Sequence, residues 1–201
     1  MEPKIGSTWI VEFPQGVDYV VKRPKNPVNL VFLYDTQMKV YDRISQFFDH
    51  YFSGISCPAL PLKLSLKKGE VKQKRVYGPT LNERGALTTD LPSKKHIDQM
   101  IGLLGCVEQL YTQDKKRRLV DLFGCDYSRG HLRGWFHSFD LVNSTNIMID
   151  GEGLNYVDCD YISPPHLFRF KYSLARIINN KLNPLRLRSI RRIKLELEQR
   201  I

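Results

Sequence analysis

The order of segment types along the chain is the feature that most restricts its fold. Strand-like segments lie at the front, and helix-like segments lie at the back. Residues 7–13 (STWIVEF) and 17–23 (VDYVVKR) are rich in β-branched and aromatic side chains, and residues 14–16 (PQG) separate them. This composition around a short turn containing proline and glycine predicts a pair of strands.

A long helix is predicted after this strand pair. Prolines at 24 and 27 end the strand pattern, and apolar side chains then recur near helical spacing through residues 28–52: Leu33, Met38, Tyr41, Ile44 and Phe48. Residues 62–68 and 71–78 predict a hairpin that turns at Gly69, and the first of the two segments alternates between apolar and polar residues like a strand. The β-rich part of the chain, with its one long helix, is therefore expected to span residues 1–78.

The rest of the chain is predicted to be mainly helical. Residues 79–92 are polar and rich in turn-forming residues, which indicates a linker or hinge. A second amphipathic helix is predicted over 96–116, a hairpin over 146–160, and helices over 166–182 and 185–201 with a break at Asn183–Pro184. Strands followed by helices predict the α+β class, with a second part over residues 93–201.

Composition restricts the partners and the compartment. The 201 residues carry a formal net charge of +10, so we expect an anionic ligand or partner such as nucleic acid, a phosphate ester or an acidic surface. The four cysteines form no CxxC or CxxH motif, which argues against a zinc site and a disulfide framework. Neither a signal peptide nor a transmembrane segment is recognisable, and we expect a cytoplasmic protein.

The stretch NIMIDGEGLNYVDCD contains the most informative polar residues. Two short apolar segments flank the turn Gly-Glu-Gly, with Asn146 before the first segment and Asp158 and Asp160 after the second. Asparagine and aspartate are common at strand ends, so a surface hairpin with polar ends explains the pattern without a function. The alternative is that these groups converge to hold a ligand.

The element order and this hairpin together resemble the protein-kinase-like fold, including its small-molecule and minimal atypical members. In that family an Asp-Leu-x-x-x-Asn loop precedes the hairpin, and a metal-binding aspartate follows it. The stretch DLVNSTNIMID resembles the loop, and VDCD contains an aspartate in the metal-binding place. The resemblance implies a bilobal α+β fold with a small antiparallel β N-lobe and a reduced helical C-lobe.

The resemblance also implies roles for individual residues. Asp140 takes the place of the catalytic base, and Asn146 and Asp158 take the places of the magnesium ligands. Lys22, in DYVVKR, takes the place of the lysine that binds the nucleotide phosphates. ATP and magnesium are the implied cofactors, and the phosphate acceptor is not implied.

Three further positions in the N-lobe and one on its helix complete the expected site. The backbone at Val76, Tyr77 and Gly78 is expected to face the adenine. Because no glutamate follows Lys22 in the predicted helix, Asp42 or Asp35 is expected to form its ion pair.

Three functions remain open at this stage. The preferred one is an ATP- and magnesium-dependent phosphotransferase. A catalytically silent pseudokinase, acting as a nucleotide-binding or interaction module, is the alternative, because Asp140 and Asn146 are six residues apart rather than five and no G-x-G-x-x-G motif is present. The third is a basic nucleic-acid-binding domain. The arginine-rich segment 185–201 suits an amphipathic helix docked on the core, or contact with nucleic acid or an anionic membrane.

Overall fold

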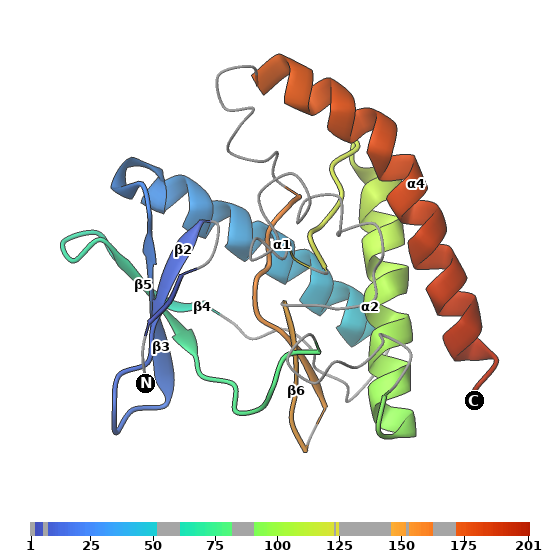
Figure 1. Cartoon of the computed structure of the whole chain (residues 1–201), viewed down its shortest axis with the longest axis horizontal. Helices are drawn as coiled ribbons and strands as arrows, with labels where there is room; N and C mark the ends of the chain where they lie inside the picture. The colour runs from blue at the N-terminus through green and yellow to red at the C-terminus, as the bar shows by residue number, and fades with distance from the viewer. Residues whose placement is uncertain are drawn as a thin grey trace.

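The computed structural model describes residues 3–5, 8–51, 61–81, 91–122, 124, 146–151, 153–162 and 172–201 (Figure 1). These residues combine antiparallel sheets with helices, so the chain belongs to the α+β class, as the sequence predicts. Within the described ranges, no helix is both long enough and apolar enough to cross a membrane.

The N-terminal part of the chain forms a five-stranded antiparallel sheet. Its strands are β1 (Lys4–Ile5), β2 (Trp9–Glu12), β3 (Tyr19–Pro24), β4 (Pro61–Ser65) and β5 (Glu70–Lys74), in the spatial order β1-β2-β3-β5-β4. Gly69 lies in the β4–β5 turn with a φ of 63°, a left-handed conformation that favours glycine. The central strand β3 pairs on one side with β2 and on the other with β5, which places Lys22 between Val11 and Val71.

Helix α1 (Leu30–Tyr51) follows a short 3₁₀ turn, η1 (Pro27–Asn29), and runs from the sheet to α2 (Figure 1). Its first residue packs with Trp9 of β2 and Val71 of β5 in a small apolar cluster beneath the sheet. Its later residues Val40, Ile44 and Phe48 are fully buried in the larger core. The helix therefore connects these two apolar clusters.

The larger core lies between α1, α2 (Lys94–Gln113), α4 (Tyr172–Glu198) and the hairpin of β6 (Ile147–Ile149) and β7 (Leu154–Tyr156). Helix α4 lies along α2 (Figure 1). Two side chains of α2 fix the hairpin: Gln99 Oε1 accepts from Leu154 N at 2.7 Å, and His96 Nε2 lies 3.1 Å from the Asp150 carbonyl oxygen.

The predicted break at Asn183–Pro184 is wrong, because α4 continues through Pro184. A proline inside a helix removes one backbone hydrogen bond and usually kinks or ends the helix. Here the buried Arg186 donates Nη1 to Asn179 Oδ1 at 3.2 Å and to Asn183 Oδ1 at 3.0 Å. These bonds join the turns on both sides of Pro184, and Leu187 and Ile190 anchor the following turn in the core.

Candidate functional site

A pocket of about 290 Å³ lies between the five-stranded sheet and the β6–β7 hairpin. Residues of β2 and β3 form one wall, residues 73–80 contribute another part, and Met148 and Val157 come from the hairpin. Three of the residues singled out in the sequence line this pocket together: Lys22, Asn146 and Asp158.

Lys22 extends from the central strand into this pocket, and its side chain is only 7% exposed. Its Nζ donates to the Val157 carbonyl oxygen at 2.9 Å and lies 3.8 Å from Asp158 Oδ1. The pairing of β3 with both neighbouring strands fixes the backbone of Lys22. A buried ammonium group is costly unless a carboxylate or carbonyl compensates it, and the hairpin supplies both.

A residue of α1 that the sequence does not single out, Gln37, also contacts Asp158. Gln37 is 1% exposed, and its Nε2 donates to Asp158 Oδ1 at 3.0 Å. Gln73 of β5 donates to the Val157 carbonyl oxygen at 3.0 Å. The segment after β7 is therefore fixed by side chains from β3, α1 and β5.

Asn146 lies beside Asp158 because the hairpin brings its two ends together. Val157 N donates to the Asn146 carbonyl oxygen at 2.9 Å, just outside β6 and β7. Asn146 Nδ2 donates to the Asp121 carbonyl oxygen at 2.9 Å, and Tyr156 Oη donates to the same oxygen at 2.9 Å. These contacts orient the amide of Asn146, which is 8% exposed.

Two more carboxyl groups, Asp121 and Asp160, lie near Asp158. The surrounding protein desolvates Asp160, and with the negative charge of Asp158 this raises the pKa of Asp160 to about 7. Desolvation, followed by the Asp158 charge, likewise raises the pKa of Asp121 to about 6. Both groups hold a proton more strongly than an ordinary aspartate, which limits the negative charge that accumulates around Asp158.

The structure does not bring Asp42 to Lys22, so the expected ion pair is corrected. Asp42 is exposed, and Asp35 pairs with Lys39 on the surface of α1. Asp42 is five positions after Gln37, which at 100° per residue places the two side chains on different faces of the helix. Gln37 is the residue of α1 that reaches the site.

A pattern in the sequence could have revealed Gln37. It stands seven residues after Leu30 and seven before Ile44, and all three side chains are buried. A single polar residue within an apolar helical stripe requires a buried hydrogen-bonding partner, because an unsatisfied amide is costly to bury.

The expected adenine-facing segment is only partly at the pocket. Val76 lines the pocket, whereas Tyr77 is 59% exposed, with its ring 4.9 Å from the Arg75 guanidinium. Gly78 approaches the hairpin so closely that a Cβ there would lie 2.1 Å from the Ile149 carbonyl oxygen. Neither Tyr77 nor Gly78 is among the residues that line the pocket.

The residues after Gly78 pair with β6. Ile149 N donates to the Pro79 carbonyl oxygen at 3.0 Å, and Leu81 N donates to the Ile147 carbonyl oxygen at 3.0 Å. The segment leaving the sheet is thereby attached to the hairpin that contains Asn146.

Asp140, the expected base, lies outside the described residues.

The oxygen donors at the pocket suit one hard cation held together with an anionic ligand. Asp158 offers a carboxylate and Asn146 an amide, and magnesium often uses one or two such protein ligands beside phosphate oxygens and water. Among the described residues, no group of three or more histidine, cysteine, aspartate or glutamate side chains has the arrangement of a metal site. Asp158 and Asn146 could hold such a cation together with phosphate oxygens and water.

No protein-family model matches the chain, and no curated protein matches it. A comparison with solved structures finds the crystal structure of aminoglycoside phosphotransferase APH(2'')-Ib with ADP bound. The two chains are 11% identical, the match covers 98% of this chain and 83% of that chain, and the TM-score is 0.34. A TM-score this low does not establish a shared fold.

Proposed function

We propose that the chain is an ATP- and magnesium-dependent phosphotransferase with a protein-kinase-like, bilobal arrangement. The observation that carries the proposal is the position of Lys22 Nζ, 3.8 Å from Asp158 Oδ1, in a pocket that Asn146 also lines. These residues come from distant parts of the sequence and combine a cation for phosphates with two oxygen donors for magnesium. Residues 1–78 and 93–201 are the proposed lobes, and 79–92 is the proposed hinge.

Each residue has a distinct role in this proposal. Lys22 binds the nucleotide phosphates, and Asp158 and Asn146 hold the magnesium ion. Val20, Val76 and Met148 give the pocket apolar side chains suited to the adenine. Bound ATP with magnesium would supply the phosphoryl group. A cytoplasmic location, where ATP and magnesium are available, is also part of the proposal.

Asp140 is the proposed base. It accepts the proton of the acceptor's nucleophile as that group bonds to the γ-phosphorus and ADP departs. A carboxylate in this role affects the transfer step and contributes little to ATP binding. The proposal concerns the nucleotide and assigns no phosphate acceptor.

Turnover measurements on Asp140→Ala test the enzymatic role. We expect ATP affinity close to that of the wild type and ATP hydrolysis or phosphotransfer lowered by about 10²-fold or more. Asp35→Ala, which removes an exposed carboxylate of α1, is the matched control and should leave turnover unchanged. Equal turnover in Asp140→Ala and the wild type would exclude this residue as the base.

One observation favours a silent nucleotide-binding module as the second candidate. The α1 side chain that contacts the site, Gln37, is neutral and supplies no carboxylate to Lys22. The ion-pair partner of Lys22 is therefore Asp158. A nucleotide complex would have to share Asp158 between Lys22 and the metal. ATP binding by the wild type without any hydrolysis or transfer would support this second function over the first.

A further inference from the structure

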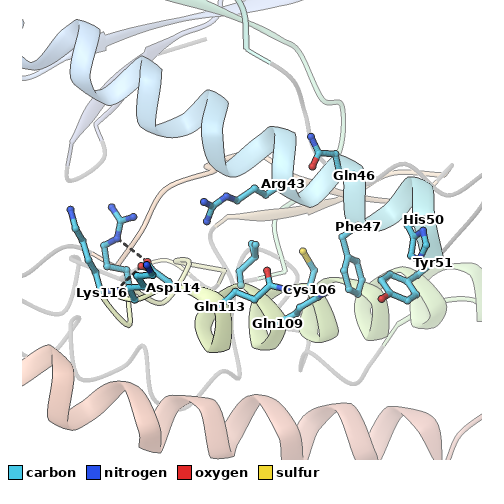
Figure 2. A pocket seen from close by; sticks show the side chains of 13 residues that line it. Arg43, Gln46, Phe47, His50, Tyr51, Cys106, Gln109, Gln113, Asp114 and Lys116 are labelled. Atoms are coloured by element: carbon cyan, nitrogen blue, oxygen red, sulfur yellow. Dashed lines mark hydrogen bonds and ion pairs between the residues drawn. The ribbon is translucent and has the colours of Figure 1, made fainter.

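A second concave surface lies between the C-terminal parts of α1 and α2 (Figure 2). This groove has a volume of about 660 Å³, and none of its lining residues belongs to the pocket around Lys22. Its walls are side chains of α1 from Arg43 to Tyr51 and of the chain from Cys106 to Arg118.

The groove has a cationic end. Arg43 of α1 and Lys116, just after α2, point into this part of the groove (Figure 2), and Lys115 and Arg118 also line it. Arg118 Nε is paired with Asp114 Oδ2 at 2.9 Å. Among the described residues, Arg43, Lys115 and Lys116 have no acidic partner, so this end has an excess of positive charge.

The opposite end is aromatic. The Phe47 and Tyr51 ring centroids are 4.6 Å apart, and the His50 and Tyr51 rings are 4.5 Å apart. Tyr51 is 57% exposed, which leaves aromatic surface available to a ligand. Figure 2 shows these three rings at the end of the groove away from Lys116. Such rings favour aromatic and aliphatic partners.

Amide side chains lie between the two ends. Gln109 and Gln113 of α2 and Gln46 of α1 line the groove, and each amide contains both a hydrogen-bond donor and an acceptor. An extended peptide backbone offers the same two groups at every residue. The wall along α2 from Cys106 to Gln113 rises by about 10 Å at 1.5 Å per residue, a length that three or four extended residues cover.

We propose that this groove binds an extended acidic segment of a partner protein, with its carboxylates at Arg43 and Lys116 and an aromatic or aliphatic side chain against Phe47 and Tyr51. A compact polyanion would use the cationic end and leave the amides and rings without a role. A contact with only three or four peptide residues forms a small interface. Small interfaces with charged residues are typical of weak, salt-sensitive and transient association. The proposed site does not depend on nucleotide binding in the pocket around Lys22.

Fluorescence anisotropy with labelled hexapeptides tests the site on the full chain without nucleotide. The probes are Glu-Asp-Glu-Gln-Phe-Phe and its reversed sequence, because the groove does not define a chain direction. We expect one order to bind, and we expect the matching Gln-Asn-Gln-Gln-Phe-Phe and Glu-Asp-Glu-Gln-Gly-Gly peptides to bind at least about tenfold more weakly. Binding should also weaken with added salt.

Substitutions locate the binding surface. Arg43→Glu and, separately, Lys116→Glu should each weaken binding of the acidic peptide at least about tenfold. Arg188→Glu is the control, because it makes the same charge change at an exposed position of α4 outside the groove. Similar weakening in Arg188→Glu and Arg43→Glu would show nonspecific attraction to a basic protein and overturn the proposal.

Two other outcomes would also overturn it. Equal binding of the acidic peptide and its amide analogue would remove the role of the cationic end. Displacement of the peptide by inositol hexakisphosphate, together with full binding by the Gly-Gly peptide, would show a site for compact polyanions. Failure of both peptide orders to bind the wild type would equally refute a peptide groove.

Discussion

At the scale of single residues, the site depends on what surrounds one carboxylate oxygen. Asp158 Oδ1 receives a hydrogen bond from Gln37 and lies 3.8 Å from Lys22 Nζ. The amide of Gln37 and the amine of Lys22 thus fix the direction of a carboxylate whose side chain is still 33% exposed. A carboxylate held in one orientation is better prepared to hold a metal ion than one that rotates freely.

Gln37→Leu tests this arrangement. The loss of one side-chain hydrogen bond to Asp158 should weaken magnesium-dependent ATP binding by roughly twofold to tenfold, the range that about 0.5–1.5 kcal/mol gives. Isothermal titration calorimetry provides the measurement. Gln46→Leu, on the same helix but outside this pocket, should bind as the wild type does. Equal affinity in Gln37→Leu and the wild type would show that Gln37 has no part in binding.

The raised pKa values of Asp121 and Asp160 predict how stability depends on pH. Both values, about 6 and about 7, exceed the ordinary value of 3.8, so between about pH 4 and pH 7 the folded protein binds more protons than the unfolded chain. The contribution of these two groups to stability is complete below the pKa of the unfolded chain and is lost as the pH rises through the pKa values of the folded protein. The free energy of unfolding should therefore fall across this window.

Asp160→Asn should reduce that fall, because it removes one of the two titrating groups. Denaturant unfolding at several pH values in buffer containing EDTA would show a flatter curve for the variant than for the wild type. The difference in unfolding free energy between the variant and the wild type should move in favour of the variant from pH 4 to pH 8. Parallel curves would mean that Asp160 titrates in the folded protein as it does in the unfolded chain.

At the scale of secondary-structure elements, the segment after β5 connects the sheet to the hairpin. Its residues 79–81 pair with β6, and Gly78 packs directly against the Ile149 carbonyl oxygen. Gly78 also has a φ of 150°, a conformation that side chains with a Cβ rarely adopt. Only glycine satisfies both conditions at this point of the chain.

Gly78→Ala should accordingly destabilise the protein. The Cβ would meet backbone atoms that cannot move aside easily, and the backbone conformation adds strain, so we expect a loss of about 3 kcal/mol. For a chain of this length, this corresponds to roughly 6–12 °C in melting temperature. Gly151→Ala is the control, because no atom lies within 4 Å of its added Cβ. Equal melting temperatures for the two variants would contradict the close approach of Gly78.

Elements with strong local signals could be predicted from the sequence. The β-branched and aromatic residues of β2 and β3, the alternating residues of β4 and the apolar stripes of α1 and α2 indicated their types correctly. Strand β1 has two residues, too few for a periodic pattern, and only its pairing with β2 defines it. The continuity of α4 through Pro184 depends on Arg186, whose bonds to Asn179 and Asn183 are not visible in a local pattern.

Prediction of the site had a similar limit. Lys22, Asn146 and Asp158 could be selected because the first lies on a predicted strand and the other two flank a predicted hairpin, as in the kinase-like family that the sequence resembles. The structure places all three at one pocket. The sequence favours Asp42 or Asp35 as the partner of Lys22, because a lysine is expected to pair with an acidic residue. The orientation of α1 instead brings Gln37 to the site. The number of residues between Lys22 and a helix position does not predict which side chain faces Lys22, because that depends on how the helix is oriented.

At the scale of the whole molecule, α1 links the sheet to the helical core, supports one concave surface from behind and lines the other. Gln37 donates a hydrogen bond to Asp158, which lines the pocket around Lys22, and α1 side chains between Arg43 and Tyr51 line the second groove. The proposed nucleotide pocket is assembled from segments as far apart as Thr8 and Asp158, so it exists only when the chain is fully folded. A ligand that binds this pocket should stabilise the entire fold by mass action.

The most direct test of the central claim is the melting temperature of the wild type and of Asp158→Asn, each with ATP in magnesium and with ATP in EDTA. ATP with magnesium at a hundred times its Kd should stabilise the wild type by about 2.7 kcal/mol, or roughly 5–11 °C. EDTA should remove much of this shift, and Asp158→Asn should lose most of the magnesium-dependent part, because a neutral amide binds a hard cation more weakly than a carboxylate does. An unchanged magnesium-dependent shift in Asp158→Asn, or no shift in the wild type, would contradict the assignment of this pocket.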